Sequence, residues 1–219
     1  MSFRIAPGTK LVMIGDSITD CGRARPFGEG RGDALGTGYV ALIDSLLRVV
    51  YPAHGLRIVN VGTGGNTVRD LKARWQSDVL DLQPGWLSIM IGINDVWRQF
   101  DSPQQTERHV GLDEYTATLD ELVRTTRTRL DGLVLMTPYF LELHRDDPMR
   151  ATMDAYGAVV QRIAAQYDAV FVNTQQAFDR LLAHMHPMSV AWDRVHPNQT
   201  GHMVLAKAWL DALGFEWAA

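Results

Sequence analysis

The sequence predicts a three-layer α/β/α domain with a central five-stranded parallel sheet. Apolar runs of about five residues alternate along the chain with longer helical patterns. The runs are nearly continuous in Val, Ile, Leu and Met, as strands buried on both faces require. Such alternation implies right-handed crossovers and helices on both faces of the sheet. Because no repeat, low-complexity tract or linker interrupts the pattern, we expect residues 1–219 to form a single domain.

The expected elements follow one another in a regular order. The strands are residues 10–14, 56–61, 86–91, 132–137 and 169–173. The helices are residues 38–50, 67–82, 113–130, 147–167, 174–183 and 198–213. In the third of these helices, Leu119, Leu122 and Val123 form an apolar stripe typical of a helix that covers a sheet. Asp146 or Asp147 is placed to cap the fourth helix.

Composition excludes several classes of partner. The net charge of −4 provides no basic surface, so we expect no nucleic acid partner. The first residues lack the apolar core of a signal peptide, and no apolar run is long enough to span a bilayer, so no membrane partner is expected. The only cysteine is Cys21, which excludes an internal disulfide and suits a reducing cytoplasm. We therefore predict a cytoplasmic protein.

Ligands in open α/β sheets bind at the carboxyl ends of the strands, so the residues just after each apolar run are the candidates for function. Gly15-Asp16-Ser17 follows the first strand. A serine at such a turn presents its hydroxyl to solvent while its own N–H points into an anion site. A helix N-cap is the plainer interpretation of this segment alone. A G-x-S-x-G elbow is absent, because position 19 is Thr.

Two further segments follow the second and third strands. Residues 62–67 are rich in glycine and run into a helix, a pattern that brings backbone N–H groups close to a ligand. A dinucleotide fingerprint fails because the third glycine is replaced by Thr67, and no G-K-[ST] follows as in a P-loop, so a tight turn stays the alternative. Asn94 offers a side-chain N–H to a developing oxyanion, or else a helix cap or Asx-turn.

Asp193 and His196 stand three residues apart just before the final helix. Imidazole titrates near neutral pH, so His196 suits a general base, and Asp193 can orient it. A polar turn before the helix is the alternative. A metal site at His184, His186 and His202 is not expected, because no cysteine or carboxylate completes the set at the usual spacing.

The serine, the glycine-rich turn, the asparagine and the Asp/His pair occur together in this order along the chain. They lie in four segments, residues 15–26, 65–70, 90–97 and 191–197. Over its whole length the chain resembles the SGNH (GDSL-type) serine hydrolase family, which has a flavodoxin-like fold. It is most similar in appearance to bacterial intracellular esterases that remove acetyl groups from xylan and xylo-oligosaccharides.

The resemblance implies a role for each matching residue. Ser17 matches the nucleophile and contributes its backbone N–H to the oxyanion hole. Gly65 matches a second backbone donor, and Asn94 matches the side-chain donor. His196 matches the base, and Asp193 its orienting carboxylate. The implied reaction is a two-step acyl transfer that needs no metal and no organic cofactor.

Two residues depart from the family pattern. Ile18 replaces the leucine of the family name, an apolar exchange of similar volume. Gly64 stands where related sequences often have serine. The resemblance also implies a homo-oligomer, and six tryptophans supply aromatic surface to bury in one.

The substrate is inferred from the loops. Residues 20–38 include six glycines and follow the nucleophile directly, so they are expected to form a wall or lid, or else an Ω-loop used in packing or subunit contacts. The candidate substrate contacts are Asp16, Arg23, Trp97 and Trp192. Polar loops favour carbohydrate and a short acyl group such as acetyl.

Three other functions stay open at this point. One is a thioesterase or lysophospholipase on the same fold. Another is a non-catalytic flavodoxin-like domain that binds phosphate at residues 62–67. The third is non-catalytic carbohydrate binding.

Overall fold

The computed structural model describes residues 3–30 and 32–217, which contain one five-stranded, all-parallel sheet. The strands are β1 (Lys10–Gly15), β2 (Arg57–Asn60), β3 (Trp86–Met90), β4 (Gly132–Met136) and β5 (Val170–Val172). Their order in the sheet is β2-β1-β3-β4-β5. All five predicted strands are confirmed to within one residue at each end. The interior strand β1, which lies between β2 and β3, is almost wholly buried, which explains its continuous apolar run.

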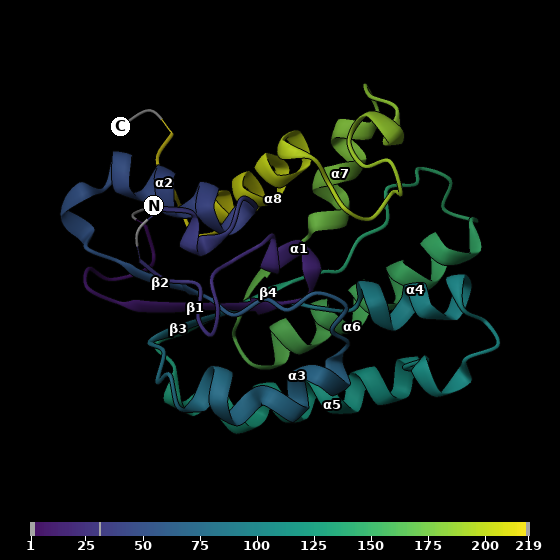
Figure 1. Ribbon diagram of the computed structural model, residues 1–219, viewed down its shortest axis with the longest axis horizontal. Helices are drawn as coiled ribbons and strands as arrows, with labels where there is room; N and C mark the ends of the chain where they lie inside the picture. The colour runs from purple at the N-terminus through teal and green to yellow at the C-terminus, as the bar shows by residue number, and fades with distance from the viewer. Residues whose placement is uncertain (1–2, 31, 218–219) are drawn as a thin grey trace.

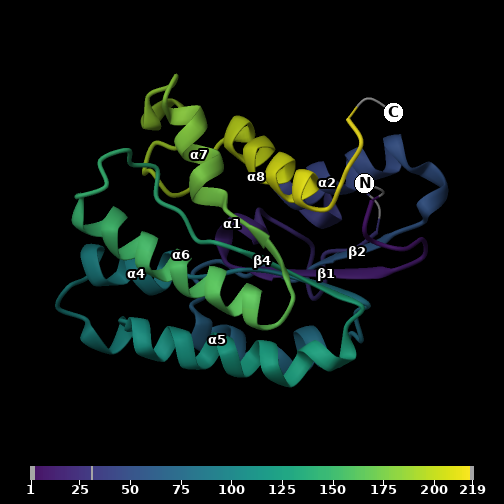
Figure 2. The ribbon, with the colours of Figure 1, turned by 180° about the vertical axis from the view of Figure 1, so that it is seen from behind.

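Helices cover both faces of the sheet (Figures 1 and 2). They are α1 (Ser17–Asp20), α2 (Tyr39–Val50), α3 (Val68–Trp75), α4 (Ile93–Asp101), α5 (Leu112–Thr126), α6 (Pro148–Gln166), α7 (Thr174–Leu182) and α8 (Gln199–Ala212). On one face α2 packs beside α8, and on the other α3 packs beside α5 and α5 beside α6. The predicted three-layer α/β/α architecture is therefore confirmed.

Shorter turns complete several predicted helices. A π-helical turn at Gln76–Leu80 continues α3, and a 3₁₀ turn at Arg127–Arg129 continues α5. Further 3₁₀ turns lie at Gly32–Leu35, Pro52–His54, Thr106–Arg108 and Pro187–Ser189. Polar side chains fix where the helices begin. Asp147 accepts a hydrogen bond from the N–H of Arg150 at the start of α6, which confirms one of the two expected caps.

Two helices were not expected from the sequence. The short α1 begins directly at Ser17, and α4 begins at Ile93, within the segment interpreted as a strand end. The first turn of α4 is buried, because Ile93 and Val96 pack into the core while Asn94 and Asp95 are polar but also enclosed. Buried polar residues interrupt the apolar stripe by which an amphipathic helix is identified. None of the described helices is long and apolar enough to cross a membrane.

Candidate active site

Ser17, His196 and Asp193 form a hydrogen-bonded series at the carboxyl edge of the sheet. Ser17 is the first residue of α1, directly after β1, and its Oγ lies 2.8 Å from Nε2 of His196. Nδ1 of His196 lies 2.6 Å from Oδ2 of Asp193. The structure therefore brings together three residues from opposite ends of the chain, in the order that nucleophile, base and orienting acid require.

The Asp193 carboxylate is fixed by its own turn. Its Oδ1 accepts hydrogen bonds from the backbone N–H groups of Val195 and His196, at 3.0 and 2.8 Å. Burial alone would raise the pKa of Asp193, but the bonds from the His196 ring and the two N–H groups outweigh burial and lower it below its usual range. An ionised Asp193 holds the proton of His196 on Nδ1, so that the lone pair of Nε2 faces the serine hydroxyl.

Ser17 has a backbone N–H available for an anion. As the first residue of α1 it has no helix carbonyl to which its N–H can donate. The preceding Asp16 caps the helix by accepting a hydrogen bond from the N–H of Ile18, at 3.0 Å. The capping bond fixes the turn that projects the Ser17 side chain away from the strand.

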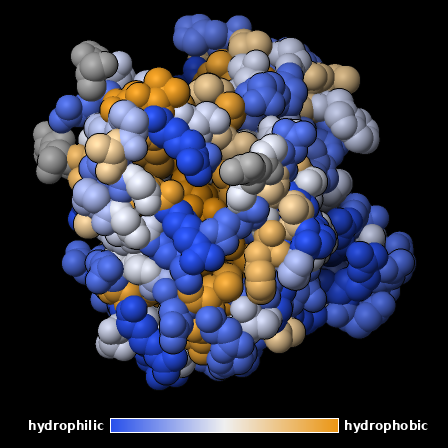
Figure 3. Space-filling view, turned by 60° about the vertical axis from the view of Figure 1, so that its left-hand side comes forward, coloured by the Kyte–Doolittle hydropathy of each residue, from blue (hydrophilic) through white to orange (hydrophobic). Residues whose placement is uncertain are grey.

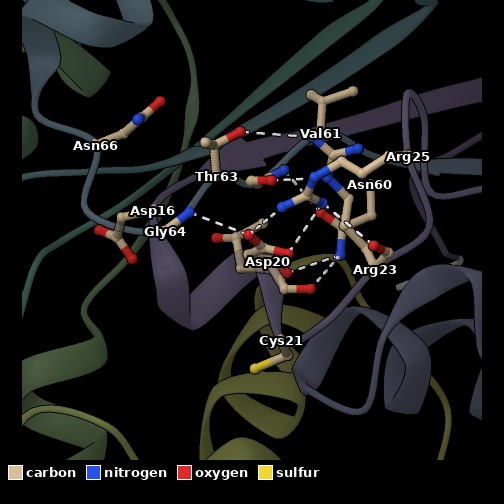
Figure 4. Close-up of polar contacts among 12 residues, drawn as sticks. Asp16, Asp20, Cys21, Arg23, Arg25, Asn60, Val61, Thr63, Gly64 and Asn66 are labelled. Carbon is tan, nitrogen blue, oxygen red and sulfur yellow. Dashed lines mark hydrogen bonds and ion pairs between the residues drawn. The ribbon is translucent and has the colours of Figure 1, made fainter.

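The loop between β2 and α3 carries Gly65, the expected second oxyanion donor. Gly65 has φ +79°, in the left-handed region that favours glycine. Its neighbour Gly64 donates its N–H to Oδ2 of Asp20, at 3.0 Å (Figure 4). The last residue of α1 therefore supports the loop from the nucleophile's own helix.

Arg74 on α3 supports the same loop from the other side. Its guanidinium donates to the carbonyl of Gly15 at the end of β1 (3.0 Å) and to that of Val61 just after β2 (2.6 Å). It also donates to the side-chain oxygen of Asn66, at 2.7 Å. One arginine thus joins the ends of two strands to the glycine loop. Nothing in the sequence pattern indicated this contact, which spans 59 positions between Arg74 and Gly15.

Asn94, the expected side-chain donor, lies in the first turn of α4 and is buried. Its Nδ2 donates to the carbonyl of Asn66, at 3.0 Å. The adjacent Asp95 accepts a hydrogen bond from the N–H of Val68, also at 3.0 Å. The start of α4 is therefore bonded to both ends of the segment that follows Gly65.

Asp95 was not recognised from the sequence. Its carboxyl is buried, and its Oδ2 has no hydrogen-bond partner among the described residues. Burial raises the pKa of Asp95 to about 7, and burial likewise raises that of Asp16 to about 7. Two buried acids with raised pKa values therefore stand next in sequence to Ser17 and Asn94, as Asp16 and Asp95. An acidic residue directly after Asn94 was the only sequence signal.

Two of the expected substrate contacts require correction. Asp16 is only 1% exposed, because its side chain turns inward to cap α1. Arg23 is 6% exposed, and its guanidinium donates to the carbonyls of Gly62 (2.7 Å) and Pro26 (2.6 Å). Burial and these bonds place both side chains where they support the site and do not face a substrate. Proximity in sequence to the nucleophile did not reveal this burial.

The two expected tryptophans lie at the site in different ways. The ring of Trp97 on α4 meets that of His196 edge-on, with centroids 5.8 Å apart. Trp192 is 79% exposed and borders a hollow beside His196. In the loop at residues 20–38, Gly28 forms two backbone hydrogen bonds with Asn60 at the end of β2. That part of the loop packs on the sheet edge.

Cys21 and His202 form a separate pair near the nucleophile. Sγ of Cys21 lies 3.2 Å from Nε2 of His202, whose Nδ1 accepts the N–H of Tyr39 at 3.2 Å. Burial lowers the pKa of His202 to about 4, so its ring is neutral at neutral pH. Across residues 3–30 and 32–217, no group of three or more His, Cys, Asp or Glu side chains is arranged to hold a metal ion.

The parallel sheet and the Ser17, His196 and Asp193 series at its carboxyl edge define the class of serine hydrolases called SGNH or GDSL-type. The chain belongs to the GDSL-like Lipase/Acylhydrolase family, whose model matches residues 13–204. It is a carboxylic ester hydrolase of that family.

Known proteins are similar over almost the entire chain. An acetylxylan esterase of Geobacillus stearothermophilus is 58% identical over 214 residues, which are 98% of each chain. The crystal structure of Axe2, an acetylxylan esterase from Geobacillus stearothermophilus, matches with a TM-score of 0.98 and 58% identity over 99% of each chain. LAE5, described as an alpha/beta hydrolase enzyme from the metagenome of Lake Arreo in Spain, matches with a TM-score of 0.96 and 53% identity over 98% of this chain and 99% of its own.

Proposed function

We propose that this protein removes acetyl groups from acetylated carbohydrate, such as xylo-oligosaccharides, through an acyl-enzyme formed on Ser17. The hydrogen-bonded series from Ser17 through His196 to Asp193 is the observation that carries the proposal. The likeness to the Geobacillus enzyme supports the acetyl group and the carbohydrate. Solved structures of variants of that enzyme describe it as an acetyl-xylooligosaccharide esterase.

The proposed reaction has two steps. In the first, Nε2 of His196 takes the proton of Ser17 as Oγ attacks the ester carbonyl, and the carbonyl electrons move to oxygen. The N–H groups of Ser17 and Gly65 and the amide of Asn94 stabilise that oxyanion, each by about 3–4 kcal/mol. The tetrahedral species then breaks its bond to the alcohol, which leaves with the proton from His196.

In the second step water replaces the alcohol. His196 takes a proton from the water as it attacks the acetyl carbonyl, and Ser17 leaves with that proton to release acetate. Asp193 stabilises the imidazolium that forms in both steps. Both half-reactions therefore use the same groups.

The alcohol of the ester belongs on the His196 side of the site, because that residue must protonate it. A hollow of about 360 Å³ adjoins His196 and is bordered by Trp192, Met188 and Pro197. We propose that the sugar binds there and that the exposed face of Trp192 stacks on it. The acetyl group then occupies the opposite side of Ser17.

The test is acetate release from acetylated xylo-oligosaccharides, measured beside hydrolysis of the acetyl and octanoyl esters of nitrophenol. Wild type is compared with Ser17→Ala and Asp193→Asn. We expect Ser17→Ala to fall to background and Asp193→Asn to lose about 10⁴-fold in kcat with the fold intact. Near-full activity of Ser17→Ala would contradict the triad.

The same assay separates the alternatives. Preference for octanoyl over acetyl would keep the triad and move the protein to a thioesterase or lysophospholipase function on this fold. If the wild-type enzyme cleaves nitrophenyl acetate but releases no acetate from acetylated xylo-oligosaccharides, the carbohydrate substrate alone is contradicted.

We also propose that the protein is a cytoplasmic homo-oligomer. The single cysteine suits a reducing compartment. Hydrophobic residues come to the surface among hydrophilic ones on the side of the molecule shown in Figure 3, and away from the hollow beside His196 the side chains of Val49, Leu143 and Trp217 are exposed. Sedimentation that shows only a monomer would contradict the oligomer.

A further inference from the structure

Arg98 contacts the side-chain oxyanion donor directly. It lies on α4 one helical turn after Asn94, and its Nη2 donates to Oδ1 of Asn94 at 3.2 Å. On its other side the guanidinium forms an ion pair with Asp101. Its Cζ lies 4.7 Å from the centre of the Trp97 ring. Three contacts thus fix the position of the guanidinium, which is largely shielded from solvent.

The contacts around Asn94 allow only one orientation of its amide. The carbonyl of Asn66 can only accept, so it must face the NH₂ group. The guanidinium of Arg98 can only donate, so it must face Oδ1. A rotation of the amide by half a turn would place oxygen against oxygen on one side and N–H against N–H on the other. The bond to Asn66 uses one of the two N–H groups of Nδ2 and leaves the second for a ligand.

We propose that Arg98 is a positioning residue for the oxyanion hole, which it serves by holding the Asn94 amide with its free N–H toward the site. The proposal rests on the proposed function, in which Asn94 donates to the oxyanion. A hydrogen bond from a charged donor to Oδ1 also draws electron density from the amide and makes its N–H a stronger donor. The fixed orientation means that no reorganisation is needed when charge develops on the substrate.

Arg98 has a second route to the site, which the experiment must separate. The Trp97 ring, on which its guanidinium lies, contacts the ring of His196. If removal of Arg98 acts through Trp97, it changes the environment of His196 and shifts the pH profile of kcat/KM. If it acts through Asn94, it lowers kcat and leaves the pH profile unchanged.

The experiment is a double-mutant cycle on the hydrolysis of nitrophenyl acetate, with Arg98→Met, Asn94→Ala and the double variant. Active enzyme is counted by titration with a covalent serine reagent, so that misfolded protein does not enter kcat. We expect Asn94→Ala to lower kcat by about 100- to 1,000-fold. Arg98→Met should lower kcat by about tenfold with KM within about twofold, and by less than about twofold in the Asn94→Ala background.

Two further variants sharpen the result. Arg98→Lys keeps a positively charged donor but loses the planar group that contacts Asn94, Asp101 and the Trp97 ring together, so it should recover only part of the lost kcat. Asp101→Asn removes the charge of the ion pair but keeps an oxygen that can accept from Arg98, and it leaves the contact with Asn94, so kcat should stay within about twofold of wild type. If Arg98→Met does not yield active enzyme, Arg98→Lys measured in the wild-type and Asn94→Ala backgrounds supplies the same cycle.

Each other outcome overturns a defined part of the proposal. Equal effects of Arg98→Met in both backgrounds, or a shifted pH profile, would overturn the positioning role while the function of Asn94 stands. A normal kcat for Asn94→Ala would overturn both the oxyanion role of Asn94 and the role of Arg98. Ser17→Ala is measured in parallel. If its activity falls to background, the role of Ser17 as nucleophile stands whatever the result for Asn94 and Arg98.

Discussion

The carboxylate of Asp20 accepts a hydrogen bond of 3.0 Å from the backbone N–H of Gly64, and so joins the helix of the nucleophile to the loop of Gly65 (Figure 4). Two of the expected oxyanion donors, the N–H groups of Ser17 and Gly65, therefore lie on segments that are bonded to each other. Asp20 is buried and also pairs with Arg25 at 2.5 Å. Burial opposes ionisation, but the bonds from Arg25 and Gly64 hold the pKa of Asp20 below its usual range.

We predict that Asp20→Ala lowers kcat by about tenfold with little change in KM, because the Gly64–Gly65 segment loses its anchor and the donor shifts. Asp20→Asn, which keeps an oxygen acceptor, should retain most of the activity. Arg25→Gln is the matched control, since it removes the partly exposed ion pair and leaves the bond to Gly64. Steady-state kinetics with nitrophenyl acetate as substrate measure kcat and KM of all three variants. A loss in Arg25→Gln as large as in Asp20→Ala would assign the effect to the ion pair instead.

Substitution of the two adjacent glycines of this loop should lower kcat to very different extents. Gly65 has φ +79°, where any other residue is strained by about 1 kcal/mol, so Gly65→Ala should shift the donor and lower kcat at least tenfold. At Gly64 an added Cβ would meet nothing closer than 3.9 Å, so Gly64→Ser should stay within about threefold of wild type. Kinetics with thermal unfolding of both variants test this contrast, and similar losses at both positions would contradict it.

The strands and the residues of the proposed triad could be placed from the sequence because each depends on a local pattern. Buried parallel strands appear as continuous apolar runs, and the carboxyl-end rule then brings Ser17 to the site. Asp193 and His196 lie three positions apart, so their contact is local. Helix α4 was missed because Asn94 and Asp95 are buried polar residues in its first turn.

The contacts of the proposed oxyanion donors could not be predicted in the same way. The bond from Asn94 to Asn66 spans 28 positions and that from Gly64 to Asp20 spans 44, and no periodicity encodes either. Arg98 follows Asn94 by one helical turn, a spacing that becomes meaningful only once the helix is known. For Arg23 the error lay in treating a charged residue in a glycine-rich loop as exposed, when carbonyls from the loop satisfy its donors.

Cys21 should be unreactive although it lies four residues from the nucleophile. Burial, with the nearby charges of Asp20 and Asp16, raises the pKa of its thiol to about 11, so the thiolate is rare at pH 8. His202 cannot act as its base, because its Nδ1 accepts the N–H of Tyr39 and its proton is therefore on the Nε2 that faces the sulfur. We expect iodoacetamide at pH 8 to label Cys21 far more slowly than free glutathione and to leave esterase activity intact. Rapid labelling followed by mass spectrometry would contradict this.

The buried carboxyl of Asp95 should make the protein less stable as pH rises. Burial raises its pKa from 3.8 unfolded to about 7 folded, so the folded state binds the proton more tightly. The stability that this group contributes is fully present below pH 4 and is lost as pH rises through 7. A tenfold difference in proton affinity between the two states corresponds to about 1.4 kcal/mol, so the loss of stability amounts to a few kcal/mol.

Asp95→Asn removes this dependence, because the amide is neutral at every pH and its oxygen can still accept from Val68. We expect the free energy of unfolding of the variant, relative to wild type, to increase between pH 5 and pH 8. Asp16 has a similarly raised pKa and stays in both proteins, so the remaining slope of the variant reports that second carboxyl. Urea unfolding at the two pH values measures the difference. An equal loss of stability in the variant at pH 5 and pH 8 would mean that Asp95 is ionised in the folded protein at both, with Oδ2 held by a partner such as water.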